Sequence, residues 1–295
     1  MDTQPFHSGF VAIVGRPNVG KSTLMNALIG EKVSIVSSKP QTTRNRIMGV
    51  AGGEDWQIVF LDTPGMHTPR TRLGEYMVKS IEDAMEGIDC LIVMADLTAI
   101  GHQDREIMKQ MATKKVPRIL VLNKMDLVEE KRIFETLAEL ASYEYDAMIP
   151  VSARTGSGLE ELKKILKKTL PEGPRYFPED MITDQPERLI IAEIIREKAL
   201  LHLKDEVPHG IGVEIMRIEK KSETLTDVFA TIYCERSSHK GIIIGKQGCM
   251  LRTIGTESRQ DIETLMDTRI NLKLWVKVRE DWRNRISDLK TLGYE

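Results

Sequence analysis

Short apolar runs alternate with amphipathic stretches from Phe10 to about Leu170. In residues 135–141 and 159–170, apolar side chains recur every three or four positions, which is typical of helices. The apolar runs contain few polar positions, as expected for parallel strands that helices cover on both faces. They predict five strands: Phe10–Val14, Trp56–Leu61, Cys90–Ala95, Arg118–Leu122 and Ala147–Val151. This part of the chain is therefore expected to be an α/β domain with a mostly parallel sheet.

A proline-rich stretch interrupts the alternation. Pro171, Pro174 and Pro178 fall within eight positions, and neither a helix nor an inner strand continues through such a segment. We therefore expect a first domain over residues 1–172, a linker over 173–185 and a second domain over 186–295.

The second domain is predicted to begin with an amphipathic helix near Glu187–Lys204. Its apolar stripe consists of Ile190, Ile191, Ile194, Ile195 and Leu201. The charged Glu193, Arg196 and Glu197 are expected to lie off this stripe. The following segments are two strands, a helical turn or two, a helix and a strand, near Gly212–Glu219, Asp227–Cys234, Gly241–Ile244, Cys249–Met266 and Ile270–Val278. The order α, β, β, α, α, β predicts an α+β domain.

Composition narrows the class of protein. The three cysteines of this 295-residue chain are widely spaced, which argues against a disulfide framework or a zinc site and for a reducing, cytosolic setting. No apolar run approaches the roughly 20 residues of a membrane span, and the N-terminus lacks a signal-peptide pattern. A soluble, cytoplasmic protein is expected, and peripheral contact with the inner membrane stays open. The net charge of −2 argues against a globally basic nucleic-acid binder, although it can hide a local basic patch.

The strongest motif is Gly15-Arg16-Pro17-Asn18-Val19-Gly20-Lys21-Ser22, between a predicted strand and a predicted helix. This is the context of a phosphate-binding loop, in which backbone amides and the helix dipole favour an anion. Lys21 would reach the β- and γ-phosphates, and the Ser22 hydroxyl would bind Mg²⁺.

Two further segments predict a metal- and γ-phosphate-sensing site. Thr43, in the polar segment 39–44, is the first candidate for a threonine that binds Mg²⁺, and Thr42 is the alternative. Asp62 ends a predicted strand, as a carboxylate that holds Mg²⁺ must. Gly65 would let its amide approach the γ-phosphate closely.

The base is predicted to be guanine. Asn123-Lys124-Met125-Asp126 follows an apolar strand, and the Asp126 carboxylate can accept hydrogen bonds from guanine N1–H and the exocyclic amine. Adenine lacks both of these donors. Asn123 would brace the loop, Lys124 would pack along the base, and the Ala153 amide after Ser152 would contact O6.

These elements, in this order and spacing, resemble GTPases of the TRAFAC class. The segments Gly15–Ser22, Lys39–Arg44 and Asp62–His67 are similar to those of the Era family of bacterial ribosome-assembly GTPases, and the similarity continues through the second domain. It implies a P-loop GTPase domain followed by a type II KH domain, with GTP, GDP and Mg²⁺ as ligands. It also implies binding to the 3′ region of 16S rRNA and to the 30S subunit.

The expected site follows from these motifs. The catalytic residues are Lys21, Thr43, Asp62 and Gly65, and the metal ligands are Ser22, Thr43 and Asp62. The nucleotide-contacting residues are Gly15, Arg16, Pro17, Asn18, Val19, Gly20, Lys21, Ser22, Asp62, Thr63, Pro64, Gly65, Met66, Asn123, Lys124, Met125, Asp126, Ser152 and Ala153.

Two positions affect the rate expected for GTP hydrolysis. Met66 stands where Ras-like enzymes have a water-orienting glutamine, so slow intrinsic turnover is predicted. Asn18 matches the asparagine that coordinates K⁺ in related GTPases, so K⁺ stimulation is a hypothesis.

The tetrad Gly245-Lys246-Gln247-Gly248 lies between an apolar segment and a helix. Its glycines would let a nucleic-acid backbone approach, as in the loop of a KH domain that clamps about four nucleotides. Bases exceed acids between residues 236 and 259, which supports contacts to phosphates. The expected ligand is single-stranded RNA rather than DNA, and its contacts are Lys240, Gly245, Lys246, Gln247, Gly248 and Arg252.

The first interpretation is a monomeric cytoplasmic switch in which the nucleotide state alters RNA or ribosome binding. One alternative is a regulatory GTPase linked to the membrane or to cell division, with the second domain as a protein adaptor. The other is an RNA-binding protein with a degenerate nucleotide pocket, which the intact motifs disfavour.

Overall fold

Six strands pair into one sheet, and five of them are the apolar runs that the sequence predicts. Side chains on both faces of the inner strands are buried, because helices cover each face. The computed structural model describes residues 5–37, 39 and 41–294. The strands run in the order β2-β3-β1-β4-β5-β6. Their bounds are β1 His7–Gly15, β2 Ile47–Gly52, β3 Trp56–Asp62, β4 Cys90–Asp96, β5 Arg118–Asn123 and β6 Ala147–Pro150.

The edge strand β2 was not predicted. It pairs antiparallel with β3, whereas all the other strand pairs of this sheet are parallel. Two of its six residues are glycines, which weakens the strand signal in the sequence. Gly49 has a packing reason, because a Cβ there would lie 2.3 Å from Ile29 Cδ1.

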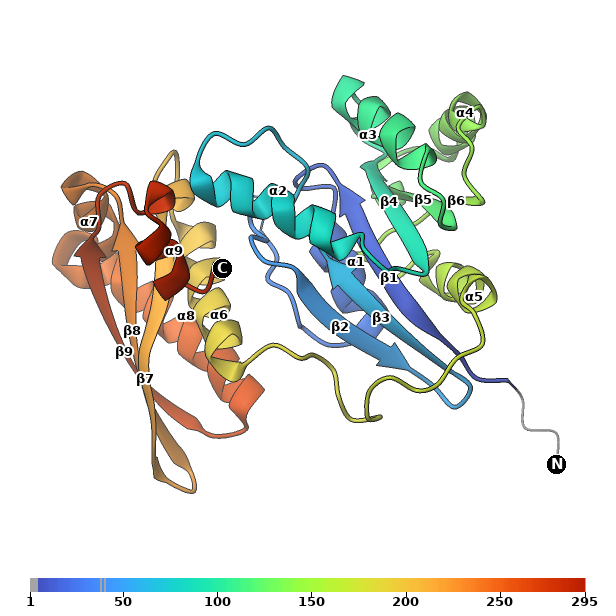
Figure 1. The fold of residues 1–295 in the computed structure, drawn as a ribbon. Helices are drawn as coiled ribbons and strands as arrows, with labels where there is room; N and C mark the ends of the chain where they lie inside the picture. Colours follow the sequence, from blue (N-terminus) through green and yellow to red (C-terminus); the bar gives the residue numbers. More distant parts are fainter. Residues whose placement is uncertain (1–4, 38, 40, 295) are drawn as a thin grey trace. The chain divides into compact units, whose positions relative to one another are not determined.

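Helices cover both faces of this sheet (Figure 1). One face packs against α1 (Lys21–Ile29) and α5 (Leu159–Thr169), through residues such as Leu24 and Leu162. The other face packs against α2 (Arg72–Ala84), α3 (His102–Ala112) and α4 (Glu130–Leu140). The predicted α/β class with a mostly parallel sheet is confirmed.

The chain divides into two compact units. The first consists of Met1–Ser34, Thr43–Thr68 and Met77–Asp184, and the second of Ile35–Thr42, Pro69–Tyr76 and Gln185–Glu295. The segment expected to be a linker is largely bound to the first unit. Buried Gln57 accepts hydrogen bonds from the amides of Tyr176 and Phe177, at 2.8 and 3.0 Å, and donates to Phe177 O.

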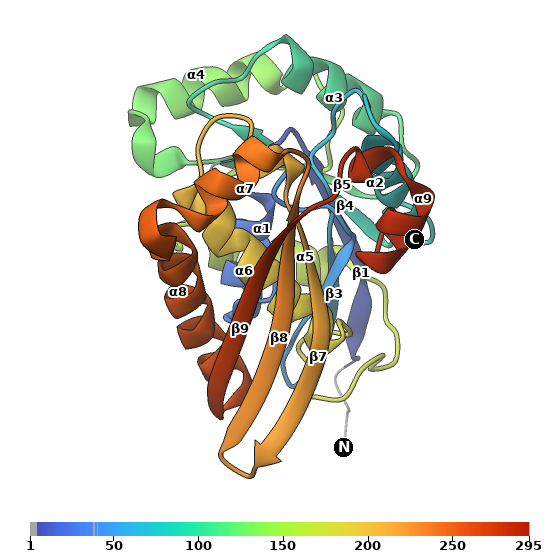
Figure 2. The same cartoon turned by 90° about the vertical axis from the view of Figure 1, so that its left-hand side faces the viewer.

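The second unit contains a three-stranded sheet, which faces the viewer in Figure 2. Strand β7 (Gly212–Ser222) is antiparallel to β8 (Leu225–Cys234), and β8 is parallel to β9 (Arg269–Val278). The helices are α6 Glu187–His202, α7 Ser237–Ile244, α8 Cys249–Met266 and α9 Ile286–Thr291. One-turn 3₁₀ helices lie at Met125–Leu127 in the first unit and at Pro208–Gly210, Lys246–Gly248 and Trp282–Asn284 in the second. The predicted order α, β, β, α, α, β is confirmed.

The prediction for the faces of α6 was partly wrong. Arg196 and Glu197 are buried, with 1% and 3% of their surfaces exposed, whereas Leu201 is 52% exposed. Both charged side chains have partners within the second unit: Arg196 contacts Glu193 and donates to Thr42 O, and Glu197 accepts from Val36 N at 2.8 Å. A helical stripe in the sequence cannot reveal that segment 35–42 packs on α6.

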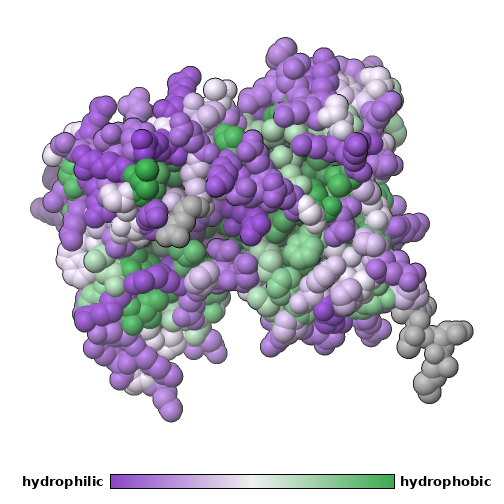
Figure 3. Space-filling view, in the orientation of Figure 1, coloured by the Kyte–Doolittle hydropathy of each residue, from purple (hydrophilic) through white to green (hydrophobic). Residues whose placement is uncertain are grey.

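Hydrophilic residues cover most of the face shown in Figure 3, with apolar areas between them. Among the helices of the described residues, none combines the length and the apolar character that crossing a bilayer requires.

Candidate nucleotide site and candidate RNA groove

The phosphate-binding loop joins β1 to α1 in a conformation that only glycine accommodates at two positions. Gly15 and Gly20 have φ angles of 153° and 103°. A Cβ at Gly15 would lie 2.5 Å from Met94 O, and one at Gly20 would lie 2.2 Å from Asn123 Nδ2. The loop is therefore formed against β4 and the end of β5.

Lys21 lies under this loop, with only 6% of its surface exposed. Its ammonium group donates to Gly15 O and Arg16 O, at 3.2 and 3.1 Å. Burial lowers the pKa of Lys21 to about 8, and the Asp62 carboxylate partly opposes that effect. A phosphate group here would favour the charged form of the lysine.

The three oxygen-bearing side chains proposed as metal ligands contact one another at the start of α1. Ser22 Oγ donates to Asp62 Oδ2 at 2.6 Å and lies 2.9 Å from Thr43 Oγ1. Thr43 also donates to Asp62, at 3.3 Å. The alternative Thr42 bonds instead to Lys39 O, at 2.6 Å, so the geometry favours Thr43.

A fourth hydroxyl in this cluster was missed. Buried Ser34 donates to Asp62 Oδ2 at 2.9 Å. Asn26 holds Ser34 by accepting from its amide at 2.9 Å and donating to its carbonyl at 2.7 Å. Asn26 follows Ser22 by four positions on α1 and so shares its helix face, a spacing visible in the sequence. The return of Ser34 to Asp62 is a tertiary contact.

The cluster suits a magnesium ion. Asp62 Oδ2 accepts hydrogen bonds from three hydroxyl groups. Its buried Oδ1 has no hydrogen-bond partner within the described part of the chain. Burial raises the pKa of Asp62, and Lys21 and the three hydroxyls oppose this. A hard divalent cation, which prefers oxygen ligands, would satisfy Oδ1 and keep the carboxylate charged.

The turn after β3 packs directly on the phosphate-binding loop. A Cβ at Gly65 would lie 2.6 Å from Pro17 Cγ, and Met66 N donates to Gly15 O at 3.0 Å. Thr63 is buried and donates to Ile13 O. Gly65 is therefore required by this contact, besides the expected approach to the γ-phosphate. The Met66 side chain packs against apolar residues and offers no group that could orient water.

The predicted base-binding residues come together at the ends of β5 and β6. Asn123 braces the phosphate-binding loop by donating to Val19 O at 2.8 Å, and it accepts from the Ala153 amide at 3.0 Å. The Asp126 carboxylate accepts from Ser152 Oγ and from Arg154, each at 2.6 Å, and these bonds lower its pKa. Asp126 is thus charged and oriented. The contact of Ala153 with O6 stays a prediction, because its amide already donates to Asn123.

Two carboxylates outside the predicted set, Asp96 and Asp104, hold predicted residues of this site. Asp96, at the end of β4, accepts from Lys124 Nζ at 2.5 Å, and two bonds from Thr98 hold the same carboxylate. Burial opposes ionisation of Asp96, yet these bonds leave its pKa lowered. Arg16 points away from the loop to Asp104, at 2.8 Å, so only its backbone is available to a nucleotide.

The glycine tetrad of the second unit joins α7 to α8. Gly245, Gln247 and Gly248 have positive φ angles of 73°, 51° and 76°. A Cβ at Gly245 would lie 2.7 Å from Met250 Cβ, whereas one at Gly248 would meet nothing within 4 Å. Gly248 thus leaves open space for a ligand backbone, and Lys246 and Gln247 are exposed.

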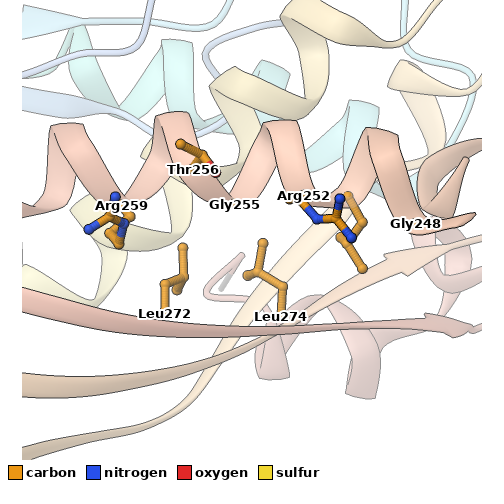
Figure 4. A pocket seen from close by; sticks show the side chains of 8 residues that line it. Gly248, Arg252, Gly255, Thr256, Arg259, Leu272 and Leu274 are labelled. Atoms are coloured by element: carbon orange, nitrogen blue, oxygen red, sulfur yellow. The ribbon is translucent and has the colours of Figure 1, made fainter.

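A groove of about 360 Å³ continues from this tetrad between α8 and β9 (Figure 4). It is lined by Gly248, Leu251, Arg252, Gly255, Thr256, Arg259, Leu272 and Leu274. Gly248 and Arg252 were predicted, and Lys240 lies nearby in sequence on α7. The leucines of β9 were missed as groove residues, because alternating apolar positions in a strand indicate only that one face is buried.

Comparison with known proteins accounts for both units. The family profile described as 50S ribosome-binding GTPase matches residues 10–124, and the KH domain profile matches residues 206–283. The chain is 50% identical to GTPase Era of Ruminiclostridium cellulolyticum over 98% of each chain. It is 51% identical to GTPase Era of Clostridioides difficile, over 98% of this chain and 99% of that one.

The chain belongs to the Era family of GTPases. Two solved Era structures match it with a TM-score of 0.94 and 41% identity, over 98% of this chain and 99% of theirs. One is a crystal structure of Era in complex with MgGDPNP and nucleotides 1506–1542 of 16S ribosomal RNA. The other is a single-residue variant of Aquifex aeolicus Era bound to GDP·AlF₄⁻. The predicted pairing of a P-loop GTPase domain with a KH domain is confirmed.

Ser34→Ala tests the unpredicted contact to Asp62. Removing a group that orients a metal-binding carboxylate should raise the Mg²⁺ concentration needed for half-maximal slowing of GDP release by about tenfold. Release of a fluorescent GDP derivative measures this. Ser34→Thr keeps the hydroxyl and should restore the wild-type value. Thr169→Ala, which removes a hydroxyl bonded within α5, is the control. A wild-type Mg²⁺ dependence in Ser34→Ala would contradict this role.

Proposed function

We propose that this chain is a guanine-nucleotide switch that binds the 3′ region of 16S rRNA and assists assembly of the 30S ribosomal subunit. Its first unit would bind GTP and GDP and hydrolyse GTP slowly, and its second unit would bind the RNA. The observation that carries this proposal is the presence, in one Era-family chain, of both the cluster around Asp62 and the groove beside Gly245–Gly248.

The nucleotide contacts follow from the geometry of the first unit. Lys21 would give up its two carbonyl contacts for phosphate oxygens, and the loop amides would bind the β-phosphate. Ser22, Thr43 and Asp62 would hold Mg²⁺, which when bound neutralises charge on the phosphates. Asp126, charged and held by Ser152, would accept from guanine N1–H and the amine. Solved Era binds MgGDPNP, which supports this assignment.

Hydrolysis is proposed to be slow. Met66 cannot orient the attacking water, and Gly65 and Thr43 contribute positioning rather than a general base. Asn18, at a φ of 65° in the phosphate-binding loop, is the proposed K⁺ ligand. A slow enzyme of this kind spends long periods in the GTP state, as a timing device requires.

The proposed RNA contacts lie in the second unit. Lys240, Lys246 and Arg252 are exposed and lie before, within and after the segment Gly245–Gly248 in the sequence, and the relative's complex contains nucleotides 1506–1542 of 16S ribosomal RNA. The profile of the first unit names the 50S subunit, but that profile ends at residue 124. The Era complex covers 98% of this chain, including the RNA-binding unit, so we favour the small subunit.

Because ribosome assembly takes place in the cytoplasm, we propose that the protein acts there, as a monomer. No observation on the described residues favours a membrane or cell-division role with the second unit as a protein adaptor. Flotation with anionic vesicles at physiological salt would measure any peripheral contact with the inner membrane.

Asp126→Asn tests the base assignment. An amide cannot accept from both guanine donors, so affinity for GDP should fall about 100-fold and affinity for xanthosine diphosphate should rise. Equilibrium binding of both nucleotides measures the change. Asp55→Asn removes a surface carboxylate paired with Lys167 and should alter neither affinity. Unchanged GDP selectivity in Asp126→Asn would show that another group reads the base.

Gly245→Asp combined with Gly248→Asp tests the RNA assignment. The added bulk and negative charge should weaken RNA binding by at least about tenfold while leaving GTP hydrolysis intact. Gln260→Asp combined with Thr264→Asp adds the same charge at exposed positions of α8 outside the groove lining, and should have little effect. Fluorescence anisotropy with the RNA of nucleotides 1506–1542 measures both. Equal RNA affinity in both double variants would contradict the proposed RNA site.

Replacing Na⁺ by K⁺ at equal ionic strength tests whether K⁺ stimulates GTP hydrolysis. The GTPase rate should rise several-fold in K⁺. Asn18→Gly tolerates the positive φ but removes the side-chain oxygen, and should abolish the K⁺ response without loss of GDP binding. Equal wild-type rates in the two salts would rule the K⁺ hypothesis out.

A further inference from the structure

The first turns of α2 belong to the second unit, whereas the rest of this helix belongs to the first. The division falls between Tyr76 and Met77, inside the continuous helix Arg72–Ala84. Within the first unit, Ile81 and Ala84 of the same helix are part of the buried core. The contacts that fix the start of α2 are therefore contacts of the second unit.

The amide at the start of α2 is bonded to a side chain from a distant part of the chain. Arg72 N donates to Asn284 Oδ1 at 3.2 Å, and Asn284 Nδ2 donates to Asp281 Oδ1 at 2.6 Å. Thr71 Oγ1, which precedes the helix, accepts from Gly74 N at 3.1 Å. The first amides of a helix have no partner within it, so two side chains cap this helix, and one of them comes from 212 positions further along the chain.

Segment 281–294, which carries this capping asparagine, is itself fixed in the second unit. Trp282 is fully buried, and its indole nitrogen donates to Gly210 O at 2.9 Å. The ring of Trp282 stacks on Tyr294 with 6.2 Å between the ring centroids, and Tyr294 lies 5.9 Å from the ring of Tyr76. The segment thus holds the first turns of α2 by a hydrogen bond and by an aromatic contact.

This segment is also close in sequence to the RNA groove. It begins three positions after Val278, the last residue of β9, and two leucines of β9 line the groove. At the other end of the contact, Pro69–Tyr76 follows the turn at Gly65 that would sense the γ-phosphate. Two residues separate Met66 from Pro69, whose φ is fixed, so few torsion angles can absorb a displacement of the turn.

We propose that Asn284 is a positioning residue through which the γ-phosphate-sensing turn changes the RNA affinity of the second unit. Its hydrogen bond to Arg72 N is stronger in one nucleotide state than in the other, and coupling between two ligands requires such a difference. Asn284 belongs neither to the proposed nucleotide site nor to the lining of the groove. The inference rests on the proposed switch and adds the contact that transmits the nucleotide state.

Asn284→Ala tests the cap. RNA affinities measured with a saturating GTP analogue and with saturating GDP should differ by at least about fivefold in the wild type. They should differ by less than about twofold in the variant, because loss of a helix cap removes a stabilisation of that order. Fluorescence anisotropy with the RNA of nucleotides 1506–1542 of 16S rRNA measures both. Asn271→Ala removes another exposed asparagine of the second unit, bonded to Asp227, and should keep the wild-type ratio.

An exchange of two side chains separates the hydrogen bond from a general structural effect. Asp281→Asn combined with Asn284→Asp keeps the net charge, and the new amide can donate to the new carboxylate, which can accept from Arg72 N. Asparagine tolerates the φ of 52° at position 281, and a carboxylate is favourable at a helix N-terminus. This double variant should recover the wild-type ratio of RNA affinities.

Two results would overturn the role of Asn284. One is the wild-type ratio in Asn284→Ala, even with an equal loss of RNA affinity in both nucleotide states, which would make the residue merely structural. The other is a lowered ratio that the exchange does not recover, because the hydrogen bond would then not be the cause. Failure of the proposed switch gives a different result, since the two affinities would already be equal in the wild type.

Discussion

The nucleotide site depends on two opposite charges that are buried at the carboxyl edge of one parallel sheet. Burial lowers the pKa of Lys21 and raises that of Asp62, so burial disfavours the charged form of each group. Their attraction, carbonyls of the phosphate-binding loop and three hydroxyls oppose this. The arrangement requires that β1 and β3 be adjacent and in register, with Ile13 opposite Asp62. A phosphate and a divalent cation would complete the same balance of charge.

Two of the hydroxyl groups that bond to Asp62 belong to Ser34 and Thr43, the residues on either side of the segment Ile35–Thr42. Ser34 and Thr43 both donate to Asp62 and belong to the first unit, whereas Ile35–Thr42 belongs to the second. Within the second unit, buried Glu197 and Arg196 of α6 bond to the backbone near the ends of that segment. The chain thus connects the proposed metal site to the RNA-binding unit by two short covalent paths. Coupling between two ligands requires that each one change the free energy of binding at the other's site, and this segment is joined to both sites.

Much of the fold and site follows from the sequence because the signals are local. Five strands are uninterrupted apolar runs, and the residues from Gly15 to Ser22, Asp62 and Asp126 follow strand ends, so their meeting at one edge follows from parallel topology. The missed features need tertiary contacts. Ser34 returns to Asp62, Asp96 holds Lys124, and Arg154 pairs with Asp126 across loops. Strand β2 was missed because two of its six residues are glycines, which lower strand propensity, and one of them, Gly49, is explained by its packing on Ile29.

In the proposed switch, nucleotide state and RNA binding are coupled in one chain. The most direct test is the affinity for RNA of nucleotides 1506–1542 of 16S rRNA, measured with saturating GDP and with a saturating non-hydrolysable GTP analogue at one Mg²⁺ concentration and one ionic strength. The affinities should differ by at least about fivefold between the two states. Equal affinities in both states would contradict a switch, even if the protein bound both nucleotide and RNA.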